Sequence, residues 1–244
     1  KGDDMPVEKE AIKRKFGNKP QKQLVTIDED GVSFKSHIDG RMLRFTPESS
    51  MDIQRKIGAD IIFAFDECTS SAETHQYQRE ALQRTHRWAD RCIAQHDANG
   101  GSKQQGLFGV VQGGKFADLR EESAKYFADR NFAGYGIGGS FTKADIGPAA
   151  AGVNQILPED RPRHLLGIGE PEDIIAGVKA GCDTFDCVQP TRIARSGQVY
   201  DQNMQKINLF NSKFQSEFEP ISATCDCYTC SNFTRAYLAH LFRA

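Results

Sequence analysis

The chain lacks the features that would assign it to a membrane, to a secretory route or to a broadly basic nucleic-acid-binding protein. No apolar run in its 244 residues approaches the roughly 20 residues that a membrane-crossing helix needs. The charged first residues contain no apolar stretch of the secretory-signal type. With 31 basic and 33 acidic residues the formal net charge is −2, so any contact with RNA or DNA must come from a local patch.

Cysteine is present in an odd number, which argues against a disulfide framework. Three of the seven cysteines fall within six positions, in the run Cys225-Asp-Cys-Tyr-Thr-Cys230. This spacing indicates metal binding in a reducing compartment, because three thiolates and one further nitrogen or sulfur ligand can hold a tetrahedral structural zinc. The only histidine downstream is His240, on a helix expected from Ser231, and it is either the fourth ligand or an ordinary helix residue.

The first part of the chain alternates short apolar segments with turn signals. We interpret residues 1–23, which are rich in charge, as a solvated lead-in or a surface helix. Segments at 24–27, 32–37 and 42–45, separated by Asp-Gly pairs, predict a β-hairpin or short antiparallel meander. Thr46-Pro47-Glu48 then combines an N-cap with a proline at the first helical position, which predicts a helix to about Ile57.

From Gly58 onward the sequence predicts strands that alternate with helices. Strands are expected at 61–65, 106–111, 133–137, 164–168 and 182–188, with a long helix after the first and helices near 115–130, 143–156 and 171–180. This order indicates an α/β fold of parallel βαβ units. We expect a TIM (β/α) barrel, complete or incomplete; a doubly wound sheet is the alternative, although its phosphate-binding fingerprint is absent after the first strand.

Each predicted strand has a polar residue or a glycine at or near its end, and these positions would share one mouth of a barrel. They are Asp66, Gln112, Gly139, Gly169 and Asp186.

Asp186 stands out because it lies in a mostly apolar segment and precedes two arginines, Arg192 and Arg195. A carboxylate at the end of a buried strand is costly unless something uses or pairs it, and guanidinium groups suit phosphate. The segment therefore indicates a nucleophile or base beside a bound polyanion, with a structural Asp–Arg ion pair as the alternative. Residues 187–216 carry four basic side chains against one acid, which is either a local positive patch or an ordinary surface.

From about Val32 to its end the chain resembles the bacterial-type tRNA-guanine transglycosylases, also called queuine tRNA-ribosyltransferases, and six segments in the family's order carry the resemblance. They are Ala64-Phe-Asp-Glu-Cys-Thr69, Phe108-Gly-Val-Val-Gln-Gly113, Gly134-Tyr-Gly-Ile-Gly-Gly139, His164-Leu-Leu-Gly-Ile-Gly169, Phe185-Asp-Cys-Val-Gln-Pro-Thr-Arg192, and the cysteine run with Arg235-Ala-Tyr-Leu-Ala-His-Leu-Phe242.

The resemblance implies a TIM barrel with a zinc-bearing subdomain, which we place at residues 1–200 and 201–244. It implies a pentosyltransferase of queuosine biosynthesis, which exchanges guanine at the tRNA wobble position for a 7-deazaguanine base. Asp186 would be the nucleophile that attacks ribose C1′ and forms a covalent intermediate. Asp66, Gln112 and the backbone at Gly139 would bind the base.

The resemblance also implies partners and further residues. The enzyme would be a cytoplasmic homodimer that binds the tRNA anticodon loop as flipped-out single-stranded RNA. Cys225, Cys227 and Cys230 would hold a structural Zn²⁺. The residues expected to contact RNA form two segments, Gly167, Ile168, Gly169, Glu170, Pro171, Glu172 and Asp173, and Thr191, Arg192, Ile193, Ala194 and Arg195.

The chain departs from the family pattern in three places. It contains no Asp-Ser-Gly-Gly-Phe motif, which carries the family's other catalytic aspartate. It also stops at Ala244, before the position of the family's fourth zinc ligand, so His240 is not expected to be that ligand. Because the chain begins at Lys1, not Met, and both of these gaps fall at its ends, we expect a transglycosylase shortened at both ends. Ser140–Asp145 replaces the family's usual Leu-(Ala/Ser)-Val-Gly-Glu turn, which leaves the accepted base open.

Two alternatives to an active transferase remain. One is a non-catalytic tRNA-binding subunit or an inactive fragment, although such a scaffold would not need Asp186, Asp66 and Gln112 together. The other is an unrelated barrel hydrolase of nucleosides or sugars, which would need neither the cysteine run nor the arginine pair.

Overall fold

The computed structural model describes residues 25–139 and 146–243, so the charged N-terminal lead-in and the 140–145 turn lie outside the described residues. No helix in these two ranges is long and apolar enough to cross a membrane. The elements, in chain order, are β1 (Val25–Ile27), β2 (Val32–Lys35), β3 (Met42–Phe45), α2 (Pro47–Ile57), β4 (Ile61–Phe63), α3 (His75–Ala98), η1 (Gly101–Lys103), β5 (Gly106–Val111), α4 (Ala117–Ala128), β6 (Gly134–Ile137), α5 (Ile146–Asn154), β7 (Arg163–Leu165), α6 (Pro171–Lys179), β8 (Thr184–Phe185), α7 (Gln189–Ala194), β9 (Gln198–Tyr200), β10 (Lys206–Asn208), η3 (Ser212–Ser216), α8 (Tyr228–Asn232) and α9 (Arg235–Leu241).

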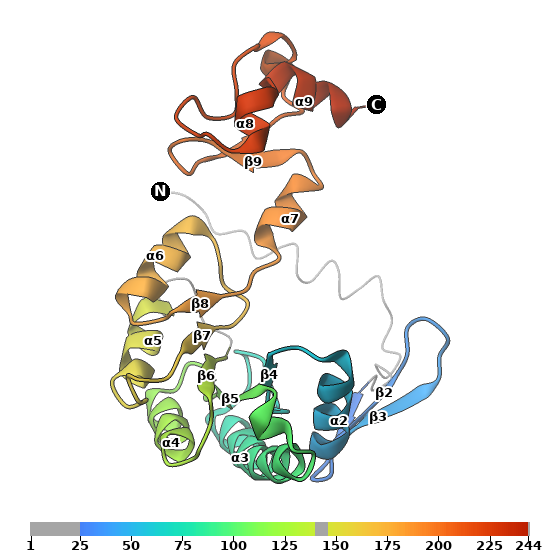
Figure 1. The fold of residues 1–244 in the computed structure, drawn as a ribbon, viewed down its shortest axis with the longest axis vertical. Coiled ribbons are helices and arrows are strands. Elements are labelled where there is room, and N and C mark those ends of the chain that lie inside the picture. Colours follow the sequence, from blue (N-terminus) through green and yellow to red (C-terminus); the bar gives the residue numbers. More distant parts are fainter. Residues whose placement is uncertain (1–24, 140–145, 244) are drawn as a thin grey trace, which may run out of the picture.

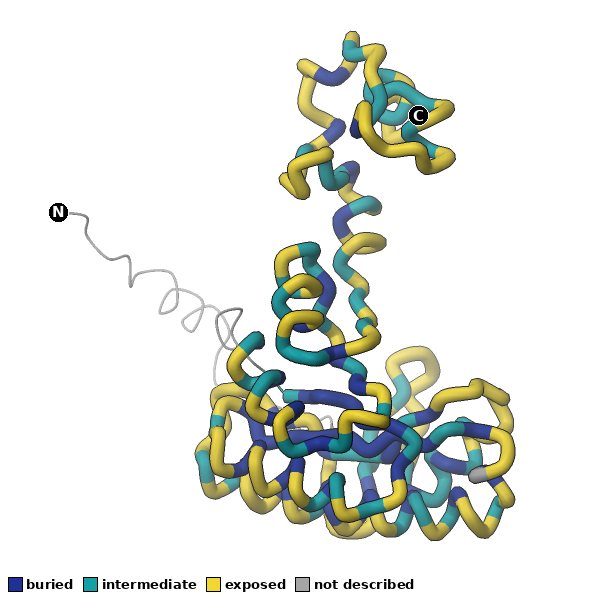
Figure 2. The backbone as a smooth tube through the Cα atoms, turned by 60° about the vertical axis from the view of Figure 1, so that its left-hand side comes forward, coloured by how far each residue is buried: buried dark blue, intermediate teal, exposed yellow. Residues whose placement is uncertain are grey.

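The centre of the molecule is a five-stranded parallel sheet in the order β4-β5-β6-β7-β8, with helices α3 to α6 between successive strands. The helices line the outer side of the sheet, and the buried residues follow the strands (Figures 1 and 2). This confirms the predicted α/β series of βαβ units. The sheet order follows the chain order without reversal, which agrees with part of a barrel and not with a doubly wound sheet.

The sheet is strongly curled. The ring of Phe63 on β4 lies 5.5 Å from the ring of His164 on β7, centroid to centroid. In a flat sheet, strands three places apart are separated by about 14 Å. The two side chains therefore meet across the concave face, and the five strands form a half-barrel that fits an incomplete TIM barrel.

Two glycines on β6 make room for aromatic rings on that concave face. A Cβ atom added at Gly134 would lie 2.4 Å from the ring of Phe108, and one at Gly136 would lie 2.9 Å from the ring of Phe63. Alternate residues of a strand face the same side, so both glycines open the same face. The tight curl depends on these small residues.

The free edge of β4 is covered by a side chain of α2. The Gln54 amide donates to the Phe63 carbonyl at 2.9 Å and accepts from the Phe63 backbone N–H at 3.0 Å. A glutamine supplies both a donor and an acceptor, so it completes the hydrogen bonding of this edge residue as a neighbouring strand would.

The N-terminal meander and helix α2 are confirmed. Strands β1, β2 and β3 pair antiparallel in that order, and Thr46 caps α2 by accepting from the Ser49 backbone N–H. Arg91 of α3 forms a two-pronged ion pair with Glu48 of α2. The indole of Trp88, also on α3, donates to the carbonyl of Glu29 at 2.7 Å. The meander is thus held against the long helix of the barrel portion.

The C-terminal portion is a small unit that follows α7 and stands away from the half-barrel (Figure 1). The predicted antiparallel excursion is confirmed as β9 and β10, and this pair spans the proposed domain boundary at residue 200, which stays a prediction. A second, small core forms from Leu209, Phe214 and Ala239.

The helix expected to carry His240 is confirmed as α9, but its expected start at Ser231 is wrong. Instead, α8 ends at Asn232, Phe233 adopts an extended backbone, and Thr234 caps a separate helix, α9, by accepting from the Tyr237 N–H at 3.2 Å. The threonine cap competes with continuation of the first helix, which explains the break.

Candidate active site and metal centre

Parallel strands bring their carboxyl ends to one edge of the half-barrel, and the expected site residues follow those ends. Asp66, Gln112 and Gly139 come after β4, β5 and β6, and Gly169 and Asp186 come after β7 and β8. The fold therefore places all five at the same mouth.

Asp66 and Gln112 form a direct pair. The Gln112 amide nitrogen donates to Asp66 Oδ2 at 2.6 Å, and Gln112 is buried, with 5% of its surface exposed. Burial raises the pKa of the Asp66 carboxyl to about 6, partly offset by the hydrogen bond from Gln112. The other amide atom, Gln112 Oε1, is buried without a partner among the described residues. The pair thus offers an acceptor beside an unused polar atom, which is an arrangement suited to a polar ligand.

Glycines flank this pair. Gly139 has a left-handed φ of 112°, and a Cβ atom added at the preceding Gly138 would lie 2.7 Å from the Gln112 amide nitrogen. A larger residue at this position would displace the Gln112 amide from its hydrogen bond to Asp66.

The strand expected at 182–188 is much shorter in the structure, and the expected burial of Asp186 is wrong. Strand β8 contains only Thr184 and Phe185, and the Asp186 side chain is 58% exposed. The reason is that β8 pairs on one side only, with β7, so no described neighbouring strand covers it.

Asp186 is held through one carboxylate oxygen. Oδ1 accepts from the Gly167 backbone N–H at 2.8 Å and lies 3.0 Å from Nε2 of His164. Oδ2 receives no hydrogen bond from residues 25–139 or 146–243. The alternative of an Asp–Arg ion pair is also wrong, because in these ranges the charged partner of Asp186 is a histidine.

The first segment expected to contact RNA forms the turn after β7 and the start of α6. Gly167 has a left-handed φ of 72°, and a Cβ atom added at Gly169 would lie 2.5 Å from Cys187. Glu170 accepts from Gln189 at 3.0 Å and pairs with Lys206 at 2.5 Å, which links the half-barrel to β10. A cavity of about 220 Å³ lies against this turn.

The second expected segment, residues 191–195, lies on α7 and at its end. Arg192 and Arg195 are exposed, and neither forms an ion pair within the described part of the chain. Ile193 is buried, so its side chain does not face a ligand. The two guanidinium groups are therefore presented to solvent close to Asp186 in the sequence.

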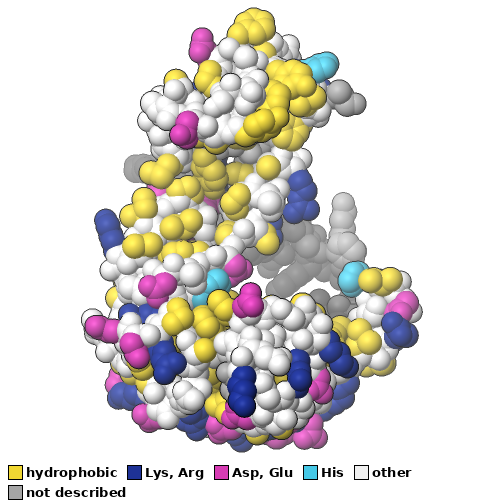
Figure 3. Space-filling view, viewed as in Figure 1, with side chains coloured by type: hydrophobic (Ala, Val, Ile, Leu, Met, Phe, Trp, Pro, Cys, Tyr) yellow, Lys and Arg dark blue, Asp and Glu magenta, His cyan; other side chains and the backbone are white. Residues whose placement is uncertain are grey.

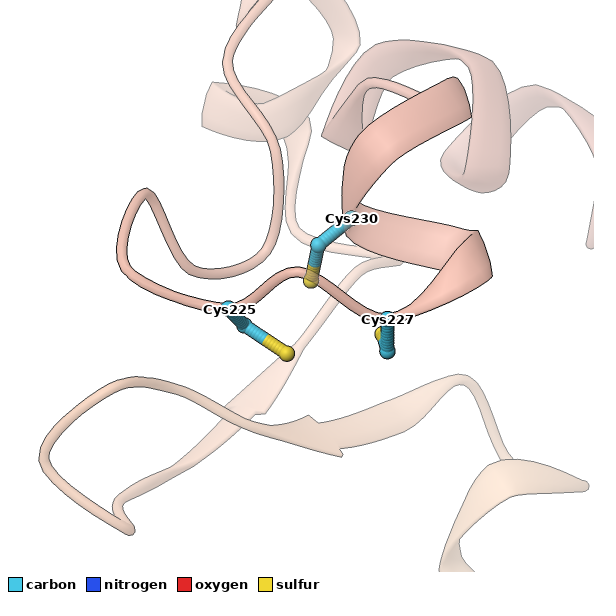
Figure 4. Close-up of side chains that lie close together, drawn as sticks. All are labelled: Cys225, Cys227 and Cys230. Atoms are coloured by element: carbon cyan, nitrogen blue, oxygen red, sulfur yellow. The ribbon is translucent and has the colours of Figure 1, made fainter.

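The three cysteines of the C-terminal run come together (Figure 4). The sulfur atoms of Cys225, Cys227 and Cys230 all lie within 4.8 Å of one another. Tetrahedral zinc with sulfur ligands at about 2.3 Å requires sulfur atoms about 3.8 Å apart, so the group fits one metal ion after small shifts. A hydrogen bond from the Cys230 backbone lowers the pKa of the Cys227 thiol, which favours the thiolate that binds metal. His240 is exposed and is not part of this group.

Sequence reasoning missed the role of His164 and Thr184. The ring of His164 bridges Thr184 and Asp186, at 2.8 Å and 3.0 Å. The available signal was the spacing of Thr184 and Asp186, which places both on one face of an extended segment. Finding the third member required the register between β7 and β8.

Comparisons with known proteins point to one family. A family model described as TGT, queuine tRNA-ribosyltransferase, matches residues 15–244. A queuine tRNA-ribosyltransferase of Herpetosiphon aurantiacus is 51% identical over 220 residues, which cover 89% of this chain and 55% of that protein. A putative queuine tRNA-ribosyltransferase of Archaeoglobus fulgidus is 46% identical over 234 residues, which cover 92% of this chain and 57% of that protein. A queuine tRNA-ribosyltransferase of Bacillus subtilis is 44% identical over 224 residues, which cover 89% of this chain and 57% of that protein. The chain thus spans little more than half the length of these relatives.

Proposed function

This chain belongs to the queuine tRNA-ribosyltransferase family, and we propose that it carries the site at which guanine in a tRNA anticodon is exchanged for a 7-deazaguanine base. The observation that carries the proposal is the state of Asp186. Its carboxylate is exposed at the mouth of the half-barrel, with Oδ1 anchored and Oδ2 without a hydrogen bond from the described residues. A fixed carboxylate with one available oxygen suits nucleophilic attack on a sugar carbon.

The reaction would proceed in two displacements at ribose C1′. In the first, Asp186 Oδ2 forms a bond to C1′ while the bond from C1′ to N9 of guanine breaks, and the base leaves with that electron pair and takes up a proton. In the second, the ring nitrogen of the incoming base attacks C1′, loses its proton and releases the carboxylate. A carboxylate stabilises the oxocarbenium character that develops in each step.

Asp66 and Gln112 would recognise the base. Guanine presents N–H donors on its Watson–Crick edge, and an ionised Asp66 accepts them, while the unpartnered Gln112 Oε1 supplies a second acceptor. With a pKa of about 6, Asp66 is mostly ionised at neutral pH. Matched acceptors of this kind reject a purine that lacks the corresponding donors.

The surroundings would hold the RNA. Arg192 and Arg195 are exposed and suit phosphate oxygens, and the turn from Gly167 to Asp173 lies beside Asp186. We propose that Cys225, Cys227 and Cys230 hold a structural Zn²⁺ that stabilises the C-terminal portion.

We also propose that the protein acts in the cytoplasm as a homodimer. Large hydrophobic side chains are exposed on the C-terminal portion, including Phe210, Phe218 and Leu241. Figure 3 displays hydrophobic side chains on this part of the molecule. Such side chains support an interface that includes the cysteine region.

A covalent-trapping experiment tests the proposal. The chain is incubated with an anticodon stem-loop RNA, with and without the deazaguanine base, and the products are separated on a denaturing gel. We expect an RNA–protein adduct that disappears in Asp186→Asn. The matched control is Asp183→Asn, whose side-chain oxygen can still accept from the Arg163 backbone N–H.

Three results are informative. An adduct that depends on Asp186 but not on Asp183 supports the exchange reaction. RNA binding without an adduct favours the non-catalytic tRNA-binding subunit. An adduct that persists in Asp186→Asn contradicts the assigned nucleophile.

A further inference from the structure

His164 lies at the centre of a three-residue chain of hydrogen bonds. Its Nε2 is 3.0 Å from Asp186 Oδ1, and its Nδ1 is 2.8 Å from the hydroxyl of Thr184. The side chain is only 15% exposed and packs against the ring of Phe63. Because His164 is the register partner of Thr184, the two contacts follow from the pairing of β7 with β8.

The partners determine where the protons lie. An ionised carboxylate only accepts hydrogen bonds, so Nε2 of His164 carries the proton that faces Asp186. In the neutral ring Nδ1 is then an acceptor, and the Thr184 hydroxyl donates to it. In this arrangement each contact of the ring has one donor and one acceptor, and of the two neutral tautomers Nε2–H is the one that satisfies both partners.

The same arrangement makes the two oxygens of Asp186 different. Oδ1 accepts from two donors on different elements, the Gly167 backbone and the His164 ring, which fixes the rotation of the carboxylate. Oδ2 accepts no hydrogen bond from the described residues, and the side chain is more than half exposed. Two hydrogen bonds to a single oxygen reduce its reactivity and leave the other oxygen as the better nucleophile.

We propose that His164 is a positioning residue that selects Oδ2 of Asp186 as the attacking atom, with Thr184 fixing the orientation of the ring. This inference rests on the proposed base exchange, because it assigns a role relative to that nucleophile. His164 does not touch the substrate in this proposal, and it acts through the carboxylate alone.

The first test is independent of activity. The full chain is labelled with ¹⁵N-histidine, and the tautomer of His164 is measured by NMR, with its signals identified as those that disappear in the His164→Gln variant. We expect the Nε2–H form in the unmodified chain and in Thr184→Val, and a shift toward mixed tautomers in Asp186→Ala, which removes the acceptor. An Nδ1–H form in the unmodified chain, or no response to Asp186→Ala, would overturn the proposal.

The second test measures the rate of adduct formation in a single turnover. His164→Leu removes the donor, and we expect the rate to fall about tenfold to a hundredfold with RNA affinity unchanged. His164→Gln restores an N–H donor near the position of Nε2 and is expected to recover most of the rate. His37→Leu is the matched control, since His37 is exposed in the turn between β2 and β3.

A merely structural histidine predicts a different pattern. His164→Gln would then be as slow as His164→Leu, or the loss of rate would accompany a loss of folding or of RNA binding, and either result refutes positioning. If no adduct forms even in the unmodified chain, the base-exchange proposal fails, while the NMR measurement still decides whether His164 holds Asp186.

Discussion

At the scale of single residues, burial changes the proton affinity of His86. Its ring stacks on Tyr126 with centroids 3.8 Å apart and planes inclined by 3°. Burial lowers the pKa of His86 from 6.5 to about 4, with a smaller contribution from nearby Arg130. Between these values the unfolded chain binds more protons than the folded one, so stability is present above pH 6.5 and is lost as the pH falls toward 4.

We therefore expect the free energy of unfolding to fall by up to about 3 kcal/mol between pH 7 and pH 4 on account of His86. His86→Phe keeps a ring against Tyr126 and cannot titrate, so it should flatten the pH dependence in this window. Urea unfolding at several pH values measures the effect, with the exposed His37→Phe as control. An unchanged slope in His86→Phe would assign the acid sensitivity to other groups.

At the scale of helices and strands, the sequence was informative wherever local signals were strong. Thr46-Pro47-Glu48 and the apolar runs predicted α2 and the order of the parallel strands, because capping and periodicity act over a few residues. The break between α8 and α9 was missed, since a single threonine between Phe233 and Arg235 is a weak signal for a new helix start.

Contacts between elements could not be predicted in the same way. The sequence placed Asp66, Gln112 and Asp186 at strand ends, but the Asp66–Gln112 bond and the His164–Asp186 contact join residues 46 and 22 positions apart. The length of β8 was overestimated, because the apolar residues of 182–188 suggested a strand with neighbours on both sides. In the structure β8 pairs with β7 alone among the described strands. Which side chains meet is decided by register and curvature.

The cysteine group leads to a prediction about α8 and its surroundings. We expect the chain to bind one zinc ion, and Cys230→Ser to lose it, because only two thiols then remain in the group. A zinc concentration a thousandfold above its dissociation constant stabilises the native state by about 4 kcal/mol.

Two measurements test the zinc prediction: metal content by mass spectrometry, and thermal unfolding with and without a chelator. Cys68→Ser, at a free cysteine outside the group, is the control, and equal zinc content in both variants would refute the assignment.

At the scale of the whole molecule, the half-barrel and the length of the relatives bear on the rate of turnover. The chain spans 55% to 57% of the compared relatives and contains no Asp-Ser-Gly-Gly-Phe motif. The resemblance implies that the aspartate of this motif is the general acid and base, and general acid–base catalysis is worth about 10² to 10⁴ in rate. We expect this 244-residue chain to exchange bases at least about a hundredfold more slowly than the Bacillus subtilis relative. Incorporation of labelled guanine into a stem-loop RNA measures both rates, and equal rates would show that the motif is dispensable.

The pairing of β7 with β8 has a consequence for how this site could be lost or altered. Thr184 and Asp186 both reach His164 only because they lie two positions apart in the β8 segment. A slip of one residue between these strands would turn both away together, although the amino-acid sequence would be unchanged. Insertions or deletions in the 166–183 connection are therefore expected to abolish the chemistry even where the sheet still forms. The length of this connection is as much a part of the site as its side chains.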